Sequence, residues 1–196
     1  IETDKLFTSV MTDHGKLGKS LADAVIQGKA VKVGILSGNQ SQLGMRQRLK
    51  SVKDKLEEAG IEISWILSEK ELDKKMRNVE YFAEQPVDTV ISLDNDDTEK
   101  AVDIILNDDR ISWKLYGEGR SEKLIYYLDK GTIQELAVPN EYYMGYQSIV
   151  LAAQNIRYYT DKTEQAEVEF YMVSKDNLYD EETSRILFPA VRLPDR

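Results

Sequence analysis

The chain has 196 residues, with 26 Lys and Arg against 35 Asp and Glu, which gives a formal net charge of −9, and 41% of its residues are hydrophobic. A chain of this length can bury a core without a metal or disulfide staple. It contains no Cys, which excludes disulfide frameworks, thiolate zinc sites and cysteine nucleophiles. The acidic balance argues against nonspecific nucleic-acid binding, because phosphate neutralisation needs a basic surface. We expect neither a signal peptide nor a membrane span, since no uninterrupted apolar run approaches about 18 residues.

Short runs rich in β-branched residues alternate with longer amphipathic stretches along the chain. This alternation is typical of a doubly wound α/β fold, in which helices cover both faces of a mostly parallel sheet as three layers. We predict strands at Phe7 to Met11, Lys32 to Ser37, Ile61 to Ile66, Thr89 to Leu93, Trp113 to Gly117 and Glu135 to Val138.

Apolar residues at helical spacing predict the helices between these strands. One helix carries Met45, Leu49, Val52, Leu56 and Ala59 on one face, and we expect Ser41 to cap its start and Gly60 to end it. The same spacing predicts a first helix around Leu17, Leu21, Ala24 and Val25, a single helix through Leu72, Met76, Val79 and Phe82, and a last long helix over 141–158.

The sequence predicts one α/β lobe over residues 1–160 followed by a different segment over 161–196. The second segment begins with the polar run TDKTEQAE, continues with VEFYMVS, which reads as one more strand, and ends in a tail. We see no internal repeat and no Gly/Ser linker, so the first segment fits the size of one domain.

The functional crevice of an open α/β sheet lies at the carboxyl ends of its strands. The residues expected there are polar and hydrogen-bonding: Thr12, Asp13 and His14; Gly38, Asn39 and Gln40; Asp94 to Asp97; Glu118, Gly119 and Arg120; Pro139, Asn140 and Glu141. Neither GILSGNQSQLG nor GEGRSEK matches a phosphate-binding loop or a dinucleotide fingerprint. These residues favour a neutral polyhydroxyl ligand over a nucleotide.

Six segments, taken in order, resemble those of type 1 periplasmic solute-binding proteins and of the related LacI-type effector domains, and the resemblance covers nearly the whole chain. TSVMTDHGKLGKSLADAV is similar to the family's hinge strand, its Asp-Asn step and the following helix, with His14 where Asn is usual. The others are GNQSQLGMRQRLKSVKDKLEEAGIEI, ISLDNDDTEKAVDII, LYGEGRSEKLIYYLDKG, AVPNEYYMGYQSIVLA and EFYMVSKDNLYD.

The resemblance implies a function by ligand capture rather than by chemistry. Family members have two lobes that close on a ligand by hinge motion, and this chain resembles mainly the C-terminal lobe. The implied partners are a small sugar or similar polyol, a missing N-terminal lobe and an ABC transporter permease or a sensor kinase. The implied location is extracytoplasmic, periplasmic or as a membrane-anchored lipoprotein, and cytoplasmic if the chain is a LacI-type regulator.

The resemblance also implies four ligand-binding residues: Arg48, Asp94, Glu118 and Asn140. Arg48 matches the arginine that donates to sugar hydroxyls, a task that suits a guanidinium with several fixed donors. Asp94 stands where Asn is common, although a shift of one residue would give that place to Asn95, and Glu118 stands where Asp is common. Pro139 replaces a hinge-side Gln, so the ligand can differ from the family's usual sugars, and binding can also have been lost.

Each candidate also has a structural interpretation. Arg48 can be a solvated or ion-paired residue, and because Arg46 lies two positions away, at most one of them lines the crevice. Asp96 and Asp97 fit helix caps better than a calcium loop, and His14 fits a hinge or surface role better than catalysis. We interpret Tyr142, Tyr143, Tyr146, Tyr158 and Tyr159 as packing or interface residues and Trp65 and Trp113 as core or sheet-edge residues.

Three rival functions stay open at this stage. The first is the effector domain of a LacI-type transcriptional regulator, which a preceding helix-turn-helix would reveal. The second is a small α/β enzyme, which we disfavour because the chain has a single His and no G-x-S-x-G elbow. A sensor module that relays binding to a kinase is also compatible. We expect no catalytic residue, no cofactor, no metal and no direct nucleic-acid binding by this segment.

Overall fold

The computed structural model describes residues 8–76, 78, 80–158 and 165–188. Within them, six strands form one sheet in the order β3-β2-β4-β5-β6-β8, and two more, β1 and β7, form a separate pair. The strands are β1 (Val10–Met11), β2 (Lys32–Leu36), β3 (Glu62–Leu67), β4 (Thr89–Ser92), β5 (Lys114–Glu118), β6 (Ile133–Pro139), β7 (Ala166–Glu167) and β8 (Phe170–Ser174).

The sheet is parallel except at one edge. Strands β3, β2, β4, β5 and β6 pair in parallel, and β8 runs antiparallel against β6, with Leu136 opposite Val173. The strand order reverses beside β2, because β3 lies on one side of it and β4 on the other. Such a switch point is where open α/β sheets bind their ligands.

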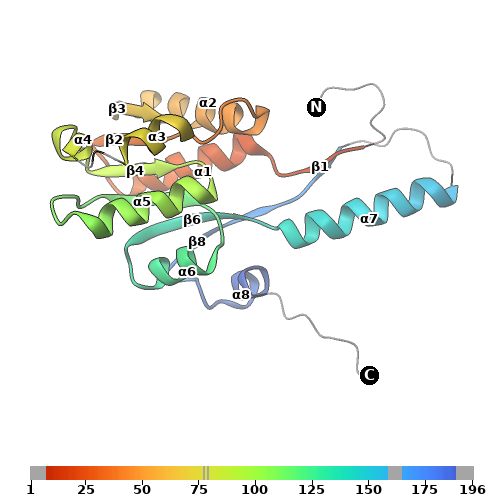
Figure 1. Cartoon of the computed structure of the whole chain (residues 1–196). Helices are drawn as coiled ribbons and strands as arrows, with labels where there is room; N and C mark the ends of the chain where they lie inside the picture. The colour runs from red at the N-terminus through yellow and green to blue at the C-terminus, as the bar shows by residue number, and fades with distance from the viewer. Residues whose placement is uncertain (1–7, 77, 79, 159–164, 189–196) are drawn as a thin grey trace.

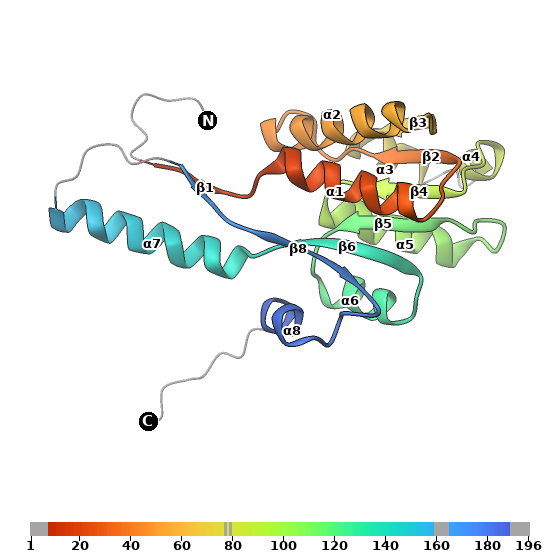
Figure 2. The same cartoon turned by 180° about the vertical axis from the view of Figure 1, so that it is seen from behind.

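Helices cover both faces of this sheet, so the predicted three-layer, doubly wound and mostly parallel α/β fold is confirmed (Figure 1). The helices are α1 (His14–Gln27), α2 (Leu43–Glu58), α3 (Glu69–Lys75), α4 (Glu80–Glu84), α5 (Asn95–Asn107), α6 (Glu122–Asp129), α7 (Glu141–Tyr158) and α8 (Glu181–Leu187). Helices α1 and α2 lie on one face, nearest the viewer in Figure 2, and α5 and α6 lie on the other.

Two apolar cores follow from the alternation of side chains along the strands. On β2, Val33 and Ile35 point into the core beneath α1 and α2. Leu36 points into the opposite core, which also contains Trp65 and the buried residues of α3 to α6 and α8. Since both faces are covered, the central strands β2, β4 and β5 are buried along nearly their whole length, as in parallel sheets generally.

Three details of the predicted elements were wrong. The first strand is only Val10–Met11 within the described residues, and Phe7 lies outside them. Ser41 does not cap α2, because its hydroxyl donates to Asn39 Oδ1 and the N-cap position is Gln42. The predicted end of the same helix is correct, because Gly60 follows it with a left-handed φ of 70° that favours glycine.

The third error is the single helix through Leu72 and Phe82, which is two short helices, α3 and α4. Helix α3 begins with a capping box between Ser68 and Glu71 and ends at Lys75, with Met76 as its C-cap. The break lets α4 place Phe82 edge-on to Trp113, with ring centroids 5.3 Å apart, and 6.0 Å from Trp65. Val79, which was part of the predicted helix, lies outside the described residues.

Helix α7 differs from the others because it extends away from the body of the molecule (Figures 1 and 2). Its bounds match the predicted 141–158. None of its described side chains is buried, and Tyr142, Tyr146, Ile149 and Ile156 are among the exposed apolar residues of the chain. Among the described residues, no helix is both long and apolar enough to cross a membrane.

Candidate functional site

The close crossing of α1 and α2 sets the geometry at the carboxyl edge of the sheet. A Cβ on Gly18 would lie 2.5 Å from the Arg48 carbonyl oxygen, and one on Gly44 would lie 2.5 Å from His14 Nε2. Real Cβ atoms do not approach so closely, so Gly18, which faces backbone atoms, requires glycine for this packing, and Gly44 gives room to the His14 ring. The two glycines therefore allow α2 to lie against the start of α1 and bring Arg48 beside His14.

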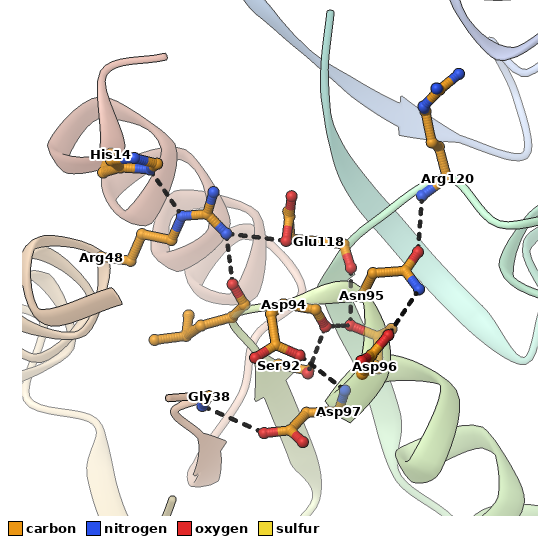
Figure 3. A network of polar contacts seen from close by, with 12 residues as sticks. His14, Gly38, Arg48, Ser92, Asp94, Asn95, Asp96, Asp97, Glu118 and Arg120 are labelled. Carbon is orange, nitrogen blue, oxygen red and sulfur yellow. Dashed lines mark hydrogen bonds and ion pairs between the residues drawn. The ribbon is translucent and has the colours of Figure 1, made fainter. Parts of the chain in front are cut away.

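Arg48 is the centre of a buried polar network (Figure 3). Its Nε donates to His14 Nδ1 at 3.1 Å, and its Nη1 donates to the Leu93 carbonyl oxygen at 2.5 Å. The same Nη1 lies 2.9 Å from Glu118 Oε2 in an ion pair. One guanidinium thus joins α1, α2 and the ends of β4 and β5.

Glu118 ends β5 and faces the guanidinium. Burial raises the pKa of this carboxyl above its ordinary value, the Arg48 charge opposes that rise, and the charges of Asp94 and Glu141 add to it. A buried ion is tolerated only when it is paired and hydrogen-bonded. The Arg48 and Glu118 charges therefore depend on each other.

Asp94 lies directly after β4 and serves as the N-cap of α5. Its Oδ1 accepts a hydrogen bond from the Asp97 amide at 2.8 Å, and its carbonyl oxygen accepts one from Thr98 Oγ1 at 2.6 Å. Thr98 Oγ1 also lies 2.9 Å from the Glu118 carbonyl oxygen, which ties α5 to the end of β5. Asp94 rather than Asp96 or Asp97 is therefore the capping residue.

Asp97 and Asn95 also hold loops at this edge. Asp97 is fully buried and its Oδ2 accepts from the Gly38 amide at 3.2 Å. Burial and the nearby Asp94 charge raise its pKa to about 6. Asn95 Oδ1 accepts from the Arg120 and Ser121 amides at 3.3 Å. Both side chains thus join neighbouring strand ends.

Asn140 follows β6 and begins α7. Its Oδ1 accepts from the Tyr143 amide at 3.0 Å, and its own amide donates to the Glu169 carbonyl oxygen at 3.2 Å. Beside it, Arg120 Nε donates to Glu141 Oε2 at 2.8 Å. Asn140 Oδ1 thus caps α7, and Arg120 links the β5 end to α7.

A hollow of about 1000 Å³ lies next to this network, between the residues after β1, the first turns of α2 and β7. His14 is in its wall, whereas Arg48, Asp94, Glu118 and Asn140 are not. Thr12 also lines it, and Thr12 Oγ1 is buried without a hydrogen-bond partner among the described residues. The other lining residues are mostly polar: Asp13, Ser41, Gln42, Arg46, Gln47, Lys50, Ser51, Gln165 and Glu167.

The structure brings the predicted residues to one edge of the sheet and pairs two of them directly. Arg48 contacts Glu118, and the charge of Asp94 acts on Glu118, whereas Asn140 lies at the start of α7. Arg46 points elsewhere, because its Nη1 donates to the carbonyls of Gln40 and Ser41.

Sequence reasoning missed the contact between His14 and Arg48. The available signal was weak: His14 follows a strand end, and the small residues Gly18 and Gly44 lie on the two helices that hold the pair. Trp65 and Trp113 are buried, as predicted. In the described part of the chain, no group of three or more His, Asp or Glu is arranged to hold a metal ion.

The mostly parallel α/β sheet, covered by helices on both faces, has the architecture of a lobe of type 1 periplasmic binding proteins. The chain belongs to the family of the periplasmic binding protein domain, whose model matches residues 2–159. Comparison with curated proteins gives no match.

Solved structures of this class share the fold. A carbohydrate transporter solute-binding protein from Agrobacterium radiobacter, in complex with D-arabinose, superposes with a TM-score of 0.83 at 16% identity, covering 94% of this chain and 67% of that one. A glucose-galactose binding protein from Geobacillus stearothermophilus gives 0.76 at 20% identity, covering 90% and 65%. A protein described as a LacI transcriptional regulator from Bacteroides fragilis gives 0.75 at 14% identity, covering 88% and 63%. The chain thus spans about two thirds of the length of these structures.

Proposed function

We propose that this chain is the lobe of a solute-binding protein that captures a sugar or similar polyol by hinge closure, without chemistry. Arg48, Asp94, Glu118 and Asn140 form its half of the ligand wall. The observation that carries the proposal is the Arg48–Glu118 pair at the carboxyl edge of the sheet, where this fold class binds ligands.

The pair offers a donor and an acceptor side by side, which is what a sugar hydroxyl needs. The guanidinium has five N–H donors and the carboxylate two acceptor oxygens. Among the described residues the second Nη atom of Arg48 makes no hydrogen bond, so a donor remains for a ligand. The Arg48 side chain is only 5% exposed, so a ligand can reach only a small part of the guanidinium.

The charge at this edge favours a neutral ligand over an anion. Glu118 balances the Arg48 charge at 2.9 Å, and Asp94 and Glu141 act on the same carboxyl. An anionic sugar phosphate would meet these carboxylates, and the Arg48 charge beside them is already paired with Glu118. A neutral polyol avoids that repulsion and can exchange hydrogen bonds with both partners.

The exposed apolar residues of α7 support a second lobe. We propose that residues 1–160 form the C-terminal lobe, that 161–196 contain a linker, a crossing strand and a tail, and that α7 packs against the N-terminal lobe. Tyr142, Ile149 and Ile156 are 70%, 72% and 76% exposed, and contiguous exposed apolar surface usually marks an interaction site.

The wider context is part of the same proposal. A solute-binding protein of this family delivers its ligand outside the cytoplasm to an ABC transporter permease or signals its presence through a sensor kinase. The similarity to solute-binding proteins of carbohydrate transporters supports uptake of a sugar.

One alternative has a specific observation in its favour, namely the similarity to a protein described as a LacI transcriptional regulator. In that case the same lobe would bind an effector in the cytoplasm, and a helix-turn-helix would precede it in the full-length protein. The sequence and cell fraction of the endogenous protein separate the two: a secreted or anchored product supports uptake, and a cytosolic product with a DNA-binding segment supports regulation.

The test of the ligand wall is a binding experiment on the full-length protein. D-arabinose, D-fucose, D-glucose and D-galactose are titrated by calorimetry, and Arg48→Met is compared with Arg46→Met, whose side chain binds loop carbonyls instead. We expect Arg48→Met to weaken binding by about tenfold or more, because a hydrogen bond from a charged donor contributes about 1.5–3 kcal/mol. Equal affinities for the two variants, or no binding of any sugar by the wild-type protein, would contradict the proposal.

A further inference from the structure

His14 contacts Arg48 (Figure 3) and also lies close to Gly44 of α2. Its Nδ1 accepts the hydrogen bond from Arg48 Nε at 3.1 Å. On its other side, the ring lies against the backbone of α2 at Gly44, where even a Cβ would come within 2.5 Å of Nε2. The imidazole therefore lies between Arg48 and α2 at Gly44, and it cannot shift further toward α2.

This contact requires a neutral imidazole with its proton on Nε2. A ring nitrogen accepts a hydrogen bond only when it carries no proton, and in the protonated form both nitrogens are donors. Protonation would place an imidazolium N–H against a guanidinium N–H and remove one of the bonds that fix Arg48. The remaining bonds, to the Leu93 carbonyl oxygen and Glu118, both go to Nη1.

We infer that His14 is a positioning residue: it orients the Arg48 guanidinium toward the ligand wall, and protonation of its ring releases that orientation and weakens ligand binding. The ligand part of this inference rests on the proposed function, whereas the positioning part is a property of the chain itself. His14 is the single histidine in the sequence, so its titration can be followed without ambiguity.

The charges around His14 act in opposite directions. Burial and the Arg48 charge lower its pKa below the ordinary value, and the neighbouring Asp13 raises it. Other charged groups that share the hollow beside the ring are Arg46 and Lys50 on α2 and Glu167 on β7. The neutral ring is therefore the form that the folded protein favours at neutral pH.

The first test uses NMR of this chain and needs no ligand. In the wild-type protein we expect His14 to titrate below its ordinary pKa with an unprotonated Nδ1, and we expect Arg48→Met to raise that pKa. The control variant is Arg46→Met, which removes a cation from the same hollow without removing the hydrogen bond. A proton on Nδ1, or equal His14 pKa values in the wild type and Arg48→Met, would overturn the positioning role.

The second test measures the affinity of the full-length protein for D-arabinose against pH. We expect the wild-type affinity to fall by about tenfold at one pH unit below the His14 pKa, because only the neutral ring holds the guanidinium. His14→Asn keeps an acceptor that does not titrate, so it should retain the affinity at neutral pH and lose this part of the pH dependence. The comparison also separates His14 from Asp97, which titrates at about 6 in both proteins.

The outcomes distinguish the proposed sugar-binding function from the positioning role of His14. If D-arabinose and the other three sugars do not bind at any pH, the proposed function fails while the NMR result still decides the positioning role. If D-arabinose binds with the same pH dependence in the wild type and His14→Asn, the role of His14 in binding is refuted. His14→Leu, which has no acceptor, should bind more weakly than His14→Asn at every pH.

Discussion

Helices α5 and α7 begin in the same way and end in different surroundings. Each follows a strand of the sheet at its carboxyl edge, and each starts with a side chain that accepts the amide three residues on: Asp94 for α5 and Asn140 for α7. Helix α5 then buries Ala101, Val102 and Ile104 against the sheet, whereas α7 buries none of its described side chains. The contrast shows that a cap determines where a helix begins, whereas the neighbouring elements determine whether its apolar side chains are buried and contribute to the stability of the fold.

One substitution in each helix tests this difference in packing most directly. Ile104→Ala should lower the free energy of unfolding by about 2–5 kcal/mol, because it leaves a cavity in a packed core. Ile149→Ala should change it by less than about 0.5 kcal/mol, since the residue is 72% exposed and touches little. Urea denaturation of this chain measures both values. A large loss for Ile149→Ala would show that α7 packs against this chain after all.

The second prediction concerns the first turn of α5 and its response to pH. The pKa of Asp97 is raised from 3.8 to about 6, so the folded state holds its proton more tightly than the unfolded state does. Its contribution to stability is therefore greatest below about pH 4, is lost as the pH rises toward 6, and amounts to about 3 kcal/mol at most.

Asp97→Asn tests this prediction, because the amide oxygen can still accept from the Gly38 amide and carries no charge. The variant carries no carboxylate to ionise, so its free energy of unfolding should rise relative to that of the wild type as the pH increases from about 4 to 7. The loss of the Asp97–Lys100 ion pair reduces this gain. Denaturation at several pH values measures the difference. A difference that does not change with pH would contradict the raised pKa.

The caps give a smaller and more selective effect. Asp94→Ala and Asn140→Ala should each cost their helix about 0.5–2 kcal/mol. For Asp94 the loss should appear in the global unfolding of the chain, because α5 is part of the core. For Asn140 it should appear as faster amide exchange in α7 with little change in global stability. Equal global losses would remove the distinction between the helices.

The smallest expected effect is a gain within α7. Gly145 lies in the middle of this helix, and apart from the local helix backbone and the adjoining residues no described atom lies within 4 Å of where its Cβ would be. Gly145→Ala should therefore raise the stability of the helix by about 0.5–1 kcal/mol through its helix propensity. Circular dichroism and amide exchange measure it. A loss of helix content would contradict the open surroundings of Gly145.

Periodicity predicted the parts of the fold that local chemistry determines. Met45, Leu49, Val52 and Leu56 marked α2, and the alternation of strands and helices gave the layered sheet. The break between α3 and α4 was missed because the requirement for it comes from the distant rings of Trp65 and Trp113. A helical repeat in the sequence carries no information about such a contact.

For the candidate site, the sequence predicted which strand ends carry polar residues. That Arg48 would reach both His14 and Glu118 was not predictable, since the three residues are far apart in the chain and meet only because α1 and α2 cross closely at Gly18. The capping role of Asp94 followed from a local rule, whereas the burial of Asp97 depends on how the loop at Gly38 packs.

The small pair of strands β1 and β7 has a mechanical consequence. They run parallel and are bonded through the Ala166 amide to the Ser9 carbonyl oxygen and the Val168 amide to the Met11 carbonyl oxygen, both at 2.9 Å. A body attached through two bonded strands can bend them together in one direction, but it cannot rotate about either strand alone without breaking these bonds. In the proposed two-lobed protein, we therefore expect this pair to let the lobes swing and to resist twisting between them.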